Sequence, residues 1–439
     1  MSLISLPVFD INMIIVISIF IATYALLLIF SDLRAYIAAG AALVYVVLGL
    51  FNVIPMTPFE ALKGIEWNVL LMIFGTMGLV TLFIESKMPS LLADKIIEWS
   101  PNVKWAIIGL AVFAGFISAF VDNVATVLMV APIALTVCKK LKVNPVPAII
   151  AIAVFSNIEG AATLVGDTTS ILLGAYANMT FFDFFFTQGH FSIFWIVQAG
   201  LLAATLVLFV IFRKEKQKMV SIEKTVVTDY VPSILMVSIV VLLIIASFIP
   251  NAPKLINGYI CVGLMLIGII WKMISKKKVS AIKETVKEID FLTLLMLAGI
   301  FVIVTALIKV GIITWLGQAL AAISGGNAFL AYSIILWGSV FLSAFIDNIP
   351  YVAMMLGVVT VIATDLGVNP MLFYFALLSG ATLGGNITPI GASANIAGIG
   401  ILRKAGYKVK TWDFMRIGLP ATLAAVGAAY ILIWVIWAH

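Results

Sequence analysis

The chain has 439 residues, of which 63% are hydrophobic and 10% are charged, and its formal net charge is +6. This composition excludes an ordinary water-soluble globular protein, and repeated apolar runs of about 20 residues predict a polytopic membrane protein. The lysines lie in short connections between apolar runs, where they set orientation in the bilayer, so no nucleic-acid partner is expected. Two histidines and two cysteines leave little material for a zinc site, a disulfide or histidine-based catalysis.

Apolar runs follow one another along the whole chain and predict an all-α fold. The first run, 11–30, lacks a basic leader and a small-residue cleavage site, so we expect a membrane span and not a signal peptide. The runs 105–138 and 329–364 are too long for one helix and rather short for two full crossings of the bilayer. Each is therefore predicted to be a re-entrant helical hairpin. The runs 148–178 and 371–402 contain glycines and polar residues, which is typical of a broken transmembrane helix. The remaining runs are 35–54, 67–86, 192–212, 231–249, 257–274, 291–308 and 417–437.

The second half of the chain repeats the first at an offset of 224 or 225 positions. Residues 65–72 (IEWNVLLM) match 289–296 (IDFLTLLM), and 163–166 (TLVG) match 388–391 (TPIG). Each half is predicted to cross the bilayer an odd number of times, so the two repeats must have inverted topology. The predicted units are a first repeat over 1–212, a basic cytoplasmic linker over 213–229 and a second repeat over 230–439.

The basic residues support this inverted arrangement. The connection 55–66 carries only Lys63, whereas its counterpart in the second half carries Lys276, Lys277, Lys278, Lys283 and Lys287. With both termini outside, 23 of the 26 basic residues fall on the cytoplasmic side, as the positive-inside rule requires. The sequence therefore predicts a multi-pass protein of the cytoplasmic membrane.

Each predicted hairpin carries one carboxylate at its centre. The segment 118–126 contains Asp122 followed by Asn123, and the matching segment 343–351 contains Asp347 followed by Asn348. A charge in the membrane interior is costly, so such residues usually line a site or a pathway. An aspartate before a helix is also a good N-cap, which gives a purely structural alternative.

The two broken helices differ in charge. Residues 156–170 (SNIEGAATLVGDTTS) hold Glu159 and Asp167, whereas 371–402 has no charged residue before Arg403 and contains Pro389 among several glycines. Backbone groups released by such breaks need partners, and an ion or substrate can supply them. Glu159 is interpreted either as a site residue or as a neutral core residue, and Asp167 either as a site residue or as a helix cap. The intramembrane acids are shared unequally, so the halves cannot build identical sites.

Residues 118–132 (SAFVDNVATVLMVAP), 156–170 and 384–395 (GGNITPIGASAN) resemble motifs of the ion transporter superfamily. Within it they are similar to the branch of the ArsB arsenite pump, the NhaD antiporters and the P protein, which is related to divalent anion/sodium symporters. The resemblance covers nearly the whole chain. It implies opposed hairpins that meet broken helices near the midplane, in a homodimer whose transport domain moves like an elevator against a scaffold.

Carried over from these motifs, the residues around substrate and coupling ion would be Asp122, Asn123, Thr126, Asn157, Thr163, Asp167, Asp347, Asn348, Asn386, Thr388, Ser393 and Asn395. Glu159 joins them because it places a further carboxylate beside the site. A sodium ion is expected near Asp122, Asn123, Asp347 and Asn348. Glu159 stands where the motif has glycine, and Thr168 and Thr169 replace two prolines, so substrate identity is not carried over.

The function expected from the sequence is secondary active transport of a small ion or oxyanion, coupled to H⁺ or Na⁺, with no other cofactor. Sodium/proton antiport and arsenite-type efflux are favoured, because the motifs contain acids and no lysine or arginine. Sodium-coupled uptake of an organic or inorganic anion is the alternative, since helix N-termini also bind anions. An ion channel is the alternative of another class. An enzyme is not expected.

Overall fold

The computed structural model of the chain describes residues 10–218, 225–227, 229–276 and 280–438. Nearly all of this part is helical, which confirms the predicted all-α class; the described strands are the short pair β1 (Phe186–Thr187) and β2 (His190–Phe191). Nine of the described helices are long and apolar enough to cross a membrane. The protein is therefore a polytopic membrane protein.

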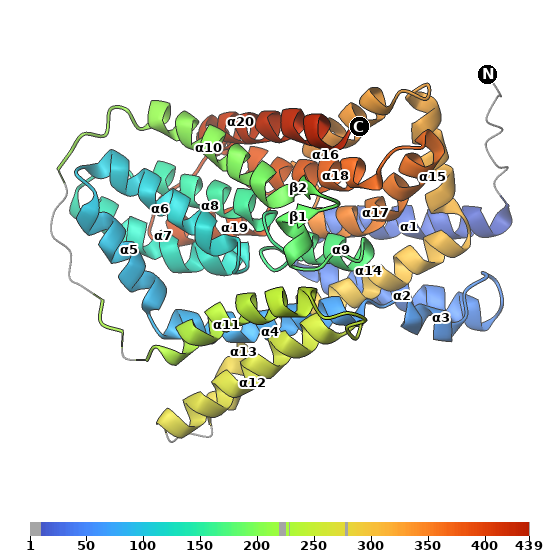
Figure 1. Ribbon diagram of the computed structural model, residues 1–439, viewed down its shortest axis with the longest axis horizontal. Coiled ribbons are helices and arrows are strands. Elements are labelled where there is room, and N and C mark those ends of the chain that lie inside the picture. The colour runs from blue at the N-terminus through green and yellow to red at the C-terminus, as the bar shows by residue number, and fades with distance from the viewer. Residues whose placement is uncertain (1–9, 219–224, 228, 277–279, 439) are drawn as a thin grey trace.

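Among the described residues, each half contains ten α-helices in the same order, and the strand pair belongs to the first half. The first half holds α1 (Ile11–Ile29), α2 (Arg34–Leu50), α3 (Pro58–Lys63), α4 (Trp67–Glu85), α5 (Met88–Trp99), α6 (Val103–Ser118), α7 (Asn123–Lys140), α8 (Val146–Gly160), α9 (Thr168–Tyr176) and α10 (Ile193–Ile211). The second half holds α11 (Val231–Ser247), α12 (Ile256–Lys276), α13 (Ser280–Lys287), α14 (Phe291–Lys309), α15 (Ile312–Ile323), α16 (Ala328–Ser343), α17 (Asn348–Leu366), α18 (Pro370–Gly384), α19 (Ser393–Lys404) and α20 (Thr411–Trp437). Corresponding helices run in opposite directions, as α10 and α20 do in Figure 1. The predicted inverted repeats are confirmed.

The predicted hairpins and broken helices are present with bounds shifted by a few residues. Residues 119–122 separate α6 from α7, and 344–347 separate α16 from α17. Residues 161–167 break the helix between α8 and α9. The corresponding break lies between α18 and α19 and contains the short 3-10 helix Gly385–Ile387.

Like α3 and α13, the short helices α5 and α15 lie in gaps between the predicted apolar runs and were not expected from the sequence. Each follows a long helix after a residue with left-handed backbone, Lys87 (φ 60°) before α5 and Gly311 (φ 81°) before α15. This conformation ends one helix and lets the next leave in a new direction. The reversal that follows α15 is sharp, with 118° between α15 and α16. Each of α5 and α15 has 12 residues, too few to cross a membrane, so apolar runs of about 20 residues do not reveal either helix.

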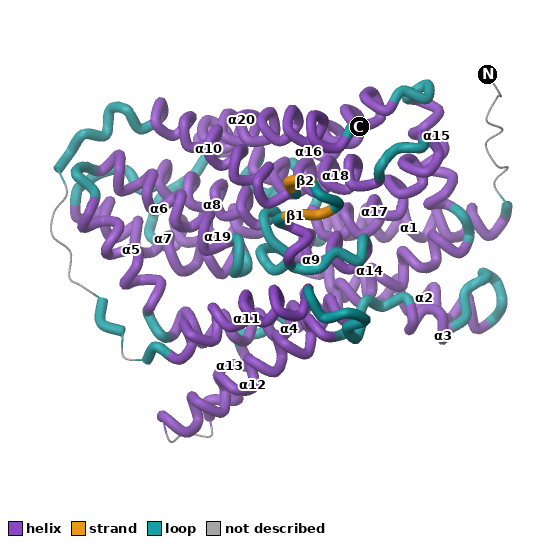
Figure 2. Tube along the Cα trace, in the orientation of Figure 1, coloured by secondary structure: helices purple, strands orange, loops and turns teal. Residues whose placement is uncertain are grey.

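The described α-helices other than α5 and α15 form two groups. The frame helices are α1–α4 and α11–α14, and the core helices are α6–α10 and α16–α20 (Figure 2). Within the frame, α4 packs along α12 and α2 packs along α14, so each half completes the other. Gly75 faces the backbone of Cys261, and its repeat equivalent Gly299 faces the backbone of Ala38. Small residues of this kind let two membrane helices approach closely.

The topology gives a prediction for chemical labelling. Lys63 ends α3, and Lys277 lies outside the described residues. Single cysteines at these two positions should react with an impermeant maleimide from opposite sides of the membrane, because they occupy corresponding connections of inverted repeats. Labelling of intact cells and of inverted vesicles provides the measurement. Reaction of both cysteines from the same side would contradict the inverted topology.

Candidate functional site

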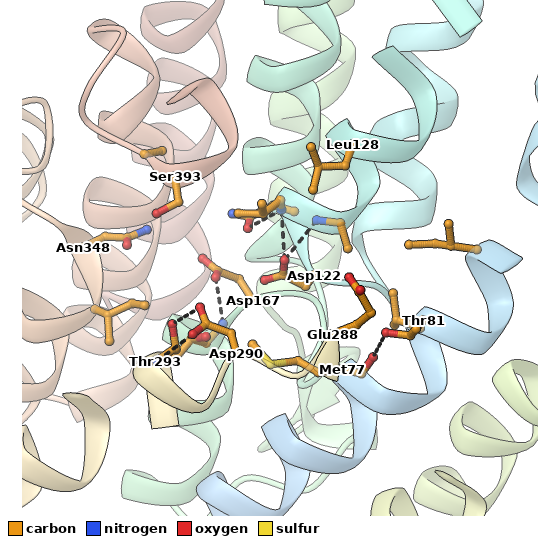
Figure 3. Close-up of a pocket in the computed structure, with 18 residues that line it drawn as sticks. Met77, Thr81, Asp122, Leu128, Asp167, Glu288, Asp290, Thr293, Asn348 and Ser393 are labelled. Carbon is orange, nitrogen blue, oxygen red and sulfur yellow. Dashed lines mark hydrogen bonds between the residues drawn. The ribbon is translucent and has the colours of Figure 1, made fainter. Parts of the chain in front are cut away.

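Helix N-termini from both halves meet around a cavity of about 410 Å³ (Figure 3). Four core helices begin at its wall, namely α7, α9, α17 and α19, and the frame contributes α4 and the start of α14. The cavity therefore lies on the border between core and frame. Its lining residues are Met77, Val80, Thr81, Ile84, Asp122, Asn123, Val124, Ala125, Leu128, Asp167, Thr168, Glu288, Asp290, Thr293, Asn348, Ile349, Ala392 and Ser393.

Four carboxylates line this cavity, and among the described residues no lysine, arginine or histidine contributes to its lining. Asp167 is buried and Asp122 is half-buried, whereas Glu288 and Asp290 are exposed at the mouth. Figure 3 shows all four around one space. Carboxylates without basic partners attract cations, and a low-dielectric wall strengthens the attraction.

The three aspartates also cap helices. Asp122 Oδ1 accepts hydrogen bonds from the backbone N–H groups of Val124 (3.0 Å) and Ala125 (3.1 Å) at the start of α7. Asp167 accepts from the backbone N–H of Thr168 and the hydroxyl of Thr169, and Asp290 accepts from both N–H and hydroxyl of Thr293. Capping and a site role are therefore compatible. In Asp122 both cap bonds use Oδ1, and Oδ2 is the atom left for a ligand.

An asparagine network joins the two broken helices behind the cavity. The Asn123 amide donates to Asn157 Oδ1 (2.8 Å), and the Asn157 amide donates to Asn386 Oδ1 (2.7 Å) and Asn395 Oδ1 (3.0 Å). The Asn395 amide in turn donates to the backbone oxygens of Gly385 and Thr388. All four asparagines are buried. The network satisfies backbone groups that the broken helix exposes and fixes the halves to each other.

Two threonines hold the hairpin tips by equivalent bonds. The Thr163 hydroxyl donates to the backbone oxygen of Ala119, and the Thr388 hydroxyl donates to that of Ala344. These pairs are related by the repeat offset, as are Gly166 and Gly391, which pack against the same tips. The matching contacts show that each broken helix is built around the hairpin of its own half.

The structure distributes the predicted site residues among several surroundings. Asp122, Asn123, Asp167, Asn348 and Ser393 line the cavity. Asn157, Asn386 and Asn395 belong to the network, and Thr163 and Thr388 hold the tips. Thr126 is buried, and its hydroxyl has no partner in the described part of the chain.

Glu159 and Asp347 lie away from the cavity lining. Glu159 is buried, and its Oε2 accepts from the Gln198 side chain on α10 (2.7 Å). Asp347 caps α17 and forms an ion pair with Arg34 at the start of α2 (2.7 Å). The sodium site expected near Asp347 therefore has Arg34 as a neighbour, which the motifs, free of lysine and arginine, did not indicate. Arg34 and Asp347 lie 313 positions apart, and nothing in the sequence indicated that they meet.

Sequence reasoning also missed the frame side of the cavity. Glu288, Asp290 and Thr293 lie there, beside Thr81 of α4. Asp290 lies in the repeat match 289–296, directly before the predicted run 291–308, and that match gives no indication of a site residue. Its position opposite Asp122 depends on tertiary packing.

The comparisons with known proteins agree with this architecture. The sequence profile of the citrate transporter family, CitMHS, matches residues 24–380. An uncharacterized transporter of Mycobacterium tuberculosis is 31% identical over 428 residues, covering 96% of this chain and 98% of that protein. The 46 kDa membrane protein of Mycobacterium leprae is 32% identical over 430 residues, with the same coverage. The P protein of Sus scrofa is 25% identical over 466 residues, covering 85% of this chain and 54% of the P protein.

Among solved structures, the YdaH transporter of Alcanivorax borkumensis superposes with a TM-score of 0.60 at 15% identity, covering 92% of this chain and 98% of that one. MtrF of Neisseria gonorrhoeae gives a TM-score of 0.52 at 17% identity, covering 83% and 80%. These likenesses concern the fold. Together with the inverted repeats, the hairpins and the profile match over most of the sequence, they establish that this chain is a membrane transporter of the citrate transporter family CitMHS, within the ion transporter superfamily.

Proposed function

We propose that the protein is a secondary active transporter that moves a small ion or oxyanion across the cytoplasmic membrane by alternating access, coupled to H⁺ or Na⁺. The observation that carries this proposal is the cavity whose described lining has four carboxylates and no basic residue. Its charge favours binding of a cation or a neutral solute over a free multivalent anion. Sodium/proton antiport and arsenite-type efflux are the favoured forms, since arsenite is largely uncharged at neutral pH.

A cation in this cavity would take mixed oxygen ligands. Among the residues that the structure describes, no three carboxylate, imidazole or thiol side chains come together to hold a metal ion. Sodium at Asp122 and its neighbours Asn123 and Asn348 would therefore use amide, backbone and water oxygens beside a carboxylate. Such a site releases its ion readily, which a transport cycle needs.

The place of the cavity supports alternating access. One wall belongs to the core hairpins and broken helices, and the other belongs to frame helices α4 and α14. A shift of the core against the frame would open the site to one side and then to the other. We propose that the core is the moving element of an elevator and that the protein works as a homodimer joined through its frame.

The mouth of the cavity defines the side to which it opens. Glu288 and Asp290 stand there, next to the connection between α13 and α14. The distribution of basic residues assigns this connection to the cytoplasm. The structure therefore corresponds to a cytoplasm-open state in this proposal.

Coupled uptake of an anion is the second candidate. The N-termini of α7, α9, α17 and α19 all reach the cavity, and helix N-termini carry partial positive charge. The family to which the chain belongs is also named for citrate transport. A bound cation would offset the carboxylates and make room for an anion beside it.

An ion channel and an enzyme are less well supported. A channel needs a continuous polar path, whereas Asn157, Asn386 and Asn395, next to Asn123 of this cavity, are buried and hydrogen-bonded to one another. Enzymatic activity would need a nucleophile with a base, and the acids of this cavity lie beside amides and threonine hydroxyls.

A substrate panel tests the cargo. Purified protein in liposomes, with an imposed proton gradient, should exchange Na⁺ or Li⁺, or move arsenite, in a saturable manner. Citrate is assayed with and without sodium as the arm for the second candidate. Citrate uptake without any sodium or arsenite flux would replace the favoured form by anion uptake, and a conductive ion flux would favour the channel.

Glu159 provides a prediction about proton coupling. Its carboxyl lies one residue before the helix break and contacts Gln198, and Oε1 is buried without a partner in the described residues. Glu159→Gln keeps the shape and can still accept the bond from Gln198. We expect this variant to flatten the pH dependence of transport more than it raises the KM for substrate. Transport rates between pH 5.5 and 8.5 provide the measurement, and an unchanged pH profile would assign Glu159 to structure alone.

A further inference from the structure

The acids at the two hairpin tips have different surroundings although the repeat makes them equivalent. Asp122 lines the acidic cavity. Asp347 instead contacts Arg34, with 2.7 Å between Arg34 Nη1 and Asp347 Oδ2 and with side chains 23% and 13% exposed. A half-buried pair of this kind is stronger than a fully exposed pair, because the surrounding dielectric is lower.

The contact joins the frame to the core. Arg34 begins frame helix α2, and its Nε also donates to the backbone oxygen of Leu27 in α1 (3.3 Å), which orients the guanidinium. Asp347 caps core helix α17. One turn farther, the hydroxyl of Tyr24 on α1 donates to the backbone oxygen of Pro350 (2.7 Å). The first turn of α17 is therefore held by two bonds from the frame.

These two bonds flank part of the cavity wall. Asn348 and Ile349, which line the cavity, lie between Asp347 and Pro350 in the sequence. Movement of the second hairpin relative to the frame must separate Arg34 from Asp347. While the ion pair is intact, Arg34 also neutralises the Asp347 carboxylate, which a mobile cation would need as a partner at this tip.

We propose that Arg34 is a tethered counter-ion of Asp347, a positioning residue that holds the second hairpin against the frame in the cavity-open state. The proposal rests on the proposed function to the extent that the core moves in the transport cycle. It divides the work of the two hairpin acids: Asp122 faces the transported or coupling ion, and Asp347 controls the position of the hairpin. Release of the hairpin requires Asp347 to give up Arg34.

The test measures how open the cavity is, without any substrate. Leu128 lines the cavity and is 51% exposed, so Leu128→Cys reports access of a maleimide to this space. The native thiols Cys138 and Cys261 are buried, and the parent protein without the reporter gives their background rate. Labelling is followed in full-length protein reconstituted in nanodiscs.

Arg34→Gln should lower the labelling rate of Leu128→Cys by roughly fivefold or more, the lower end of usual coupling between two states. Asp347→Asn should do the same, and it retains a residue that caps helices well. The double variant should show no further loss, because both changes break one contact. Arg34→Lys keeps the charge and should restore most of the labelling.

Lys309→Gln is the matched control. Lys309 pairs with Glu60, and both belong to the frame helices α14 and α3. The bond from Lys309 and the cap bonds from Thr57 lower the pKa of Glu60 to about 2, so this pair stays charged under the assay conditions. Its loss should leave labelling unchanged, because no contact between frame and core is broken.

Unchanged or faster labelling in both Arg34→Gln and Asp347→Asn, in protein that elutes as a folded species, would overturn the proposal. Equal loss in Arg34→Lys and Arg34→Gln would also overturn it, since packing and not charge would then hold the hairpin. A failed transport panel with reduced labelling would refute the proposed cargo and leave the counter-ion intact. A successful transport panel with unchanged labelling would support the proposed cargo and refute the counter-ion role of Arg34.

Discussion

Asp122→Asn is expected to lower the transport rate at least about 30-fold while the protein remains folded, because the proposed pairing of Asp122 with a bound cation would be lost, and loss of one partner of a charge pair costs about 2 kcal/mol or more. Asparagine is close in volume to aspartate and can accept the same cap bonds from Val124 and Ala125. The substitution therefore removes the charge that faces the cavity and keeps the start of α7. Asp347→Asn should also impair transport, in this case through the contact with Arg34.

The measurement is transport in liposomes with the thermal unfolding midpoint determined on the same preparations. Asp365→Asn is a suitable control, because Asp365 stands in the last turn of α17, far along the helix from the tip. It should leave transport within about twofold of the wild type, as expected for a surface change. Wild-type turnover in Asp122→Asn would remove the hairpin acid from the mechanism.

Alanine at Gly166 or Gly391 is expected to destabilise the helix breaks and abolish most transport. A Cβ on Gly166 would lie 2.8 Å from the backbone oxygen of Gly160, 2.9 Å from that of Ser118 and 3.0 Å from that of Ala119. A Cβ on Gly391 would meet the equivalent oxygens of Gly385, Ser343 and Ala344 at 2.6, 2.9 and 2.9 Å. These neighbours are backbone atoms of a hairpin tip and of the break itself, so they cannot move independently. Overpacking of this kind costs about 1–3 kcal/mol.

Gly400 and Gly338 provide the matched controls. Each lies inside a helix, α19 or α16, and an added Cβ meets nothing within 4 Å. Alanine there should leave the thermal midpoint unchanged or raise it, since alanine favours helix over glycine. If Gly166→Ala and Gly391→Ala unfold at the same temperature as these controls and transport normally, the tight contact between hairpin tip and broken helix is not required.

The repeat and the lone acids allowed much of the fold to be predicted from the sequence. Hairpin tips at Asp122 and Asp347 and breaks before Asp167 and Pro389 follow from charges, glycines and proline that an uninterrupted membrane helix excludes. Helices α5 and α15 escaped prediction because each has only 12 residues and lies in a gap between the apolar runs from which the fold was predicted.

The site was predicted less completely, for reasons of tertiary packing. Local motifs located the core side of the cavity, including Asp122, Asp167 and Asn348. The frame side, with Glu288 and Asp290, comes from a segment whose sequence looks like the start of an ordinary membrane helix. Arg34 reaches Asp347 across 313 positions, and no periodicity relates them. The predicted roles of Glu159 and Thr126 in binding substrate or coupling ion remain predictions, since both side chains lie outside the cavity lining.

Flux in sealed liposomes, with sodium and pH gradients imposed one at a time, tests the central claim most directly. A cation-coupled transporter with an acidic cavity should drive uphill proton movement from a sodium gradient, or uphill cargo movement from a pH gradient, at a fixed stoichiometry. Asp122→Asn should abolish this coupling in liposomes that remain tight. Flux that follows only its own gradient, whichever ion is varied and whether or not Asp122 is present, would contradict coupled transport by this cavity.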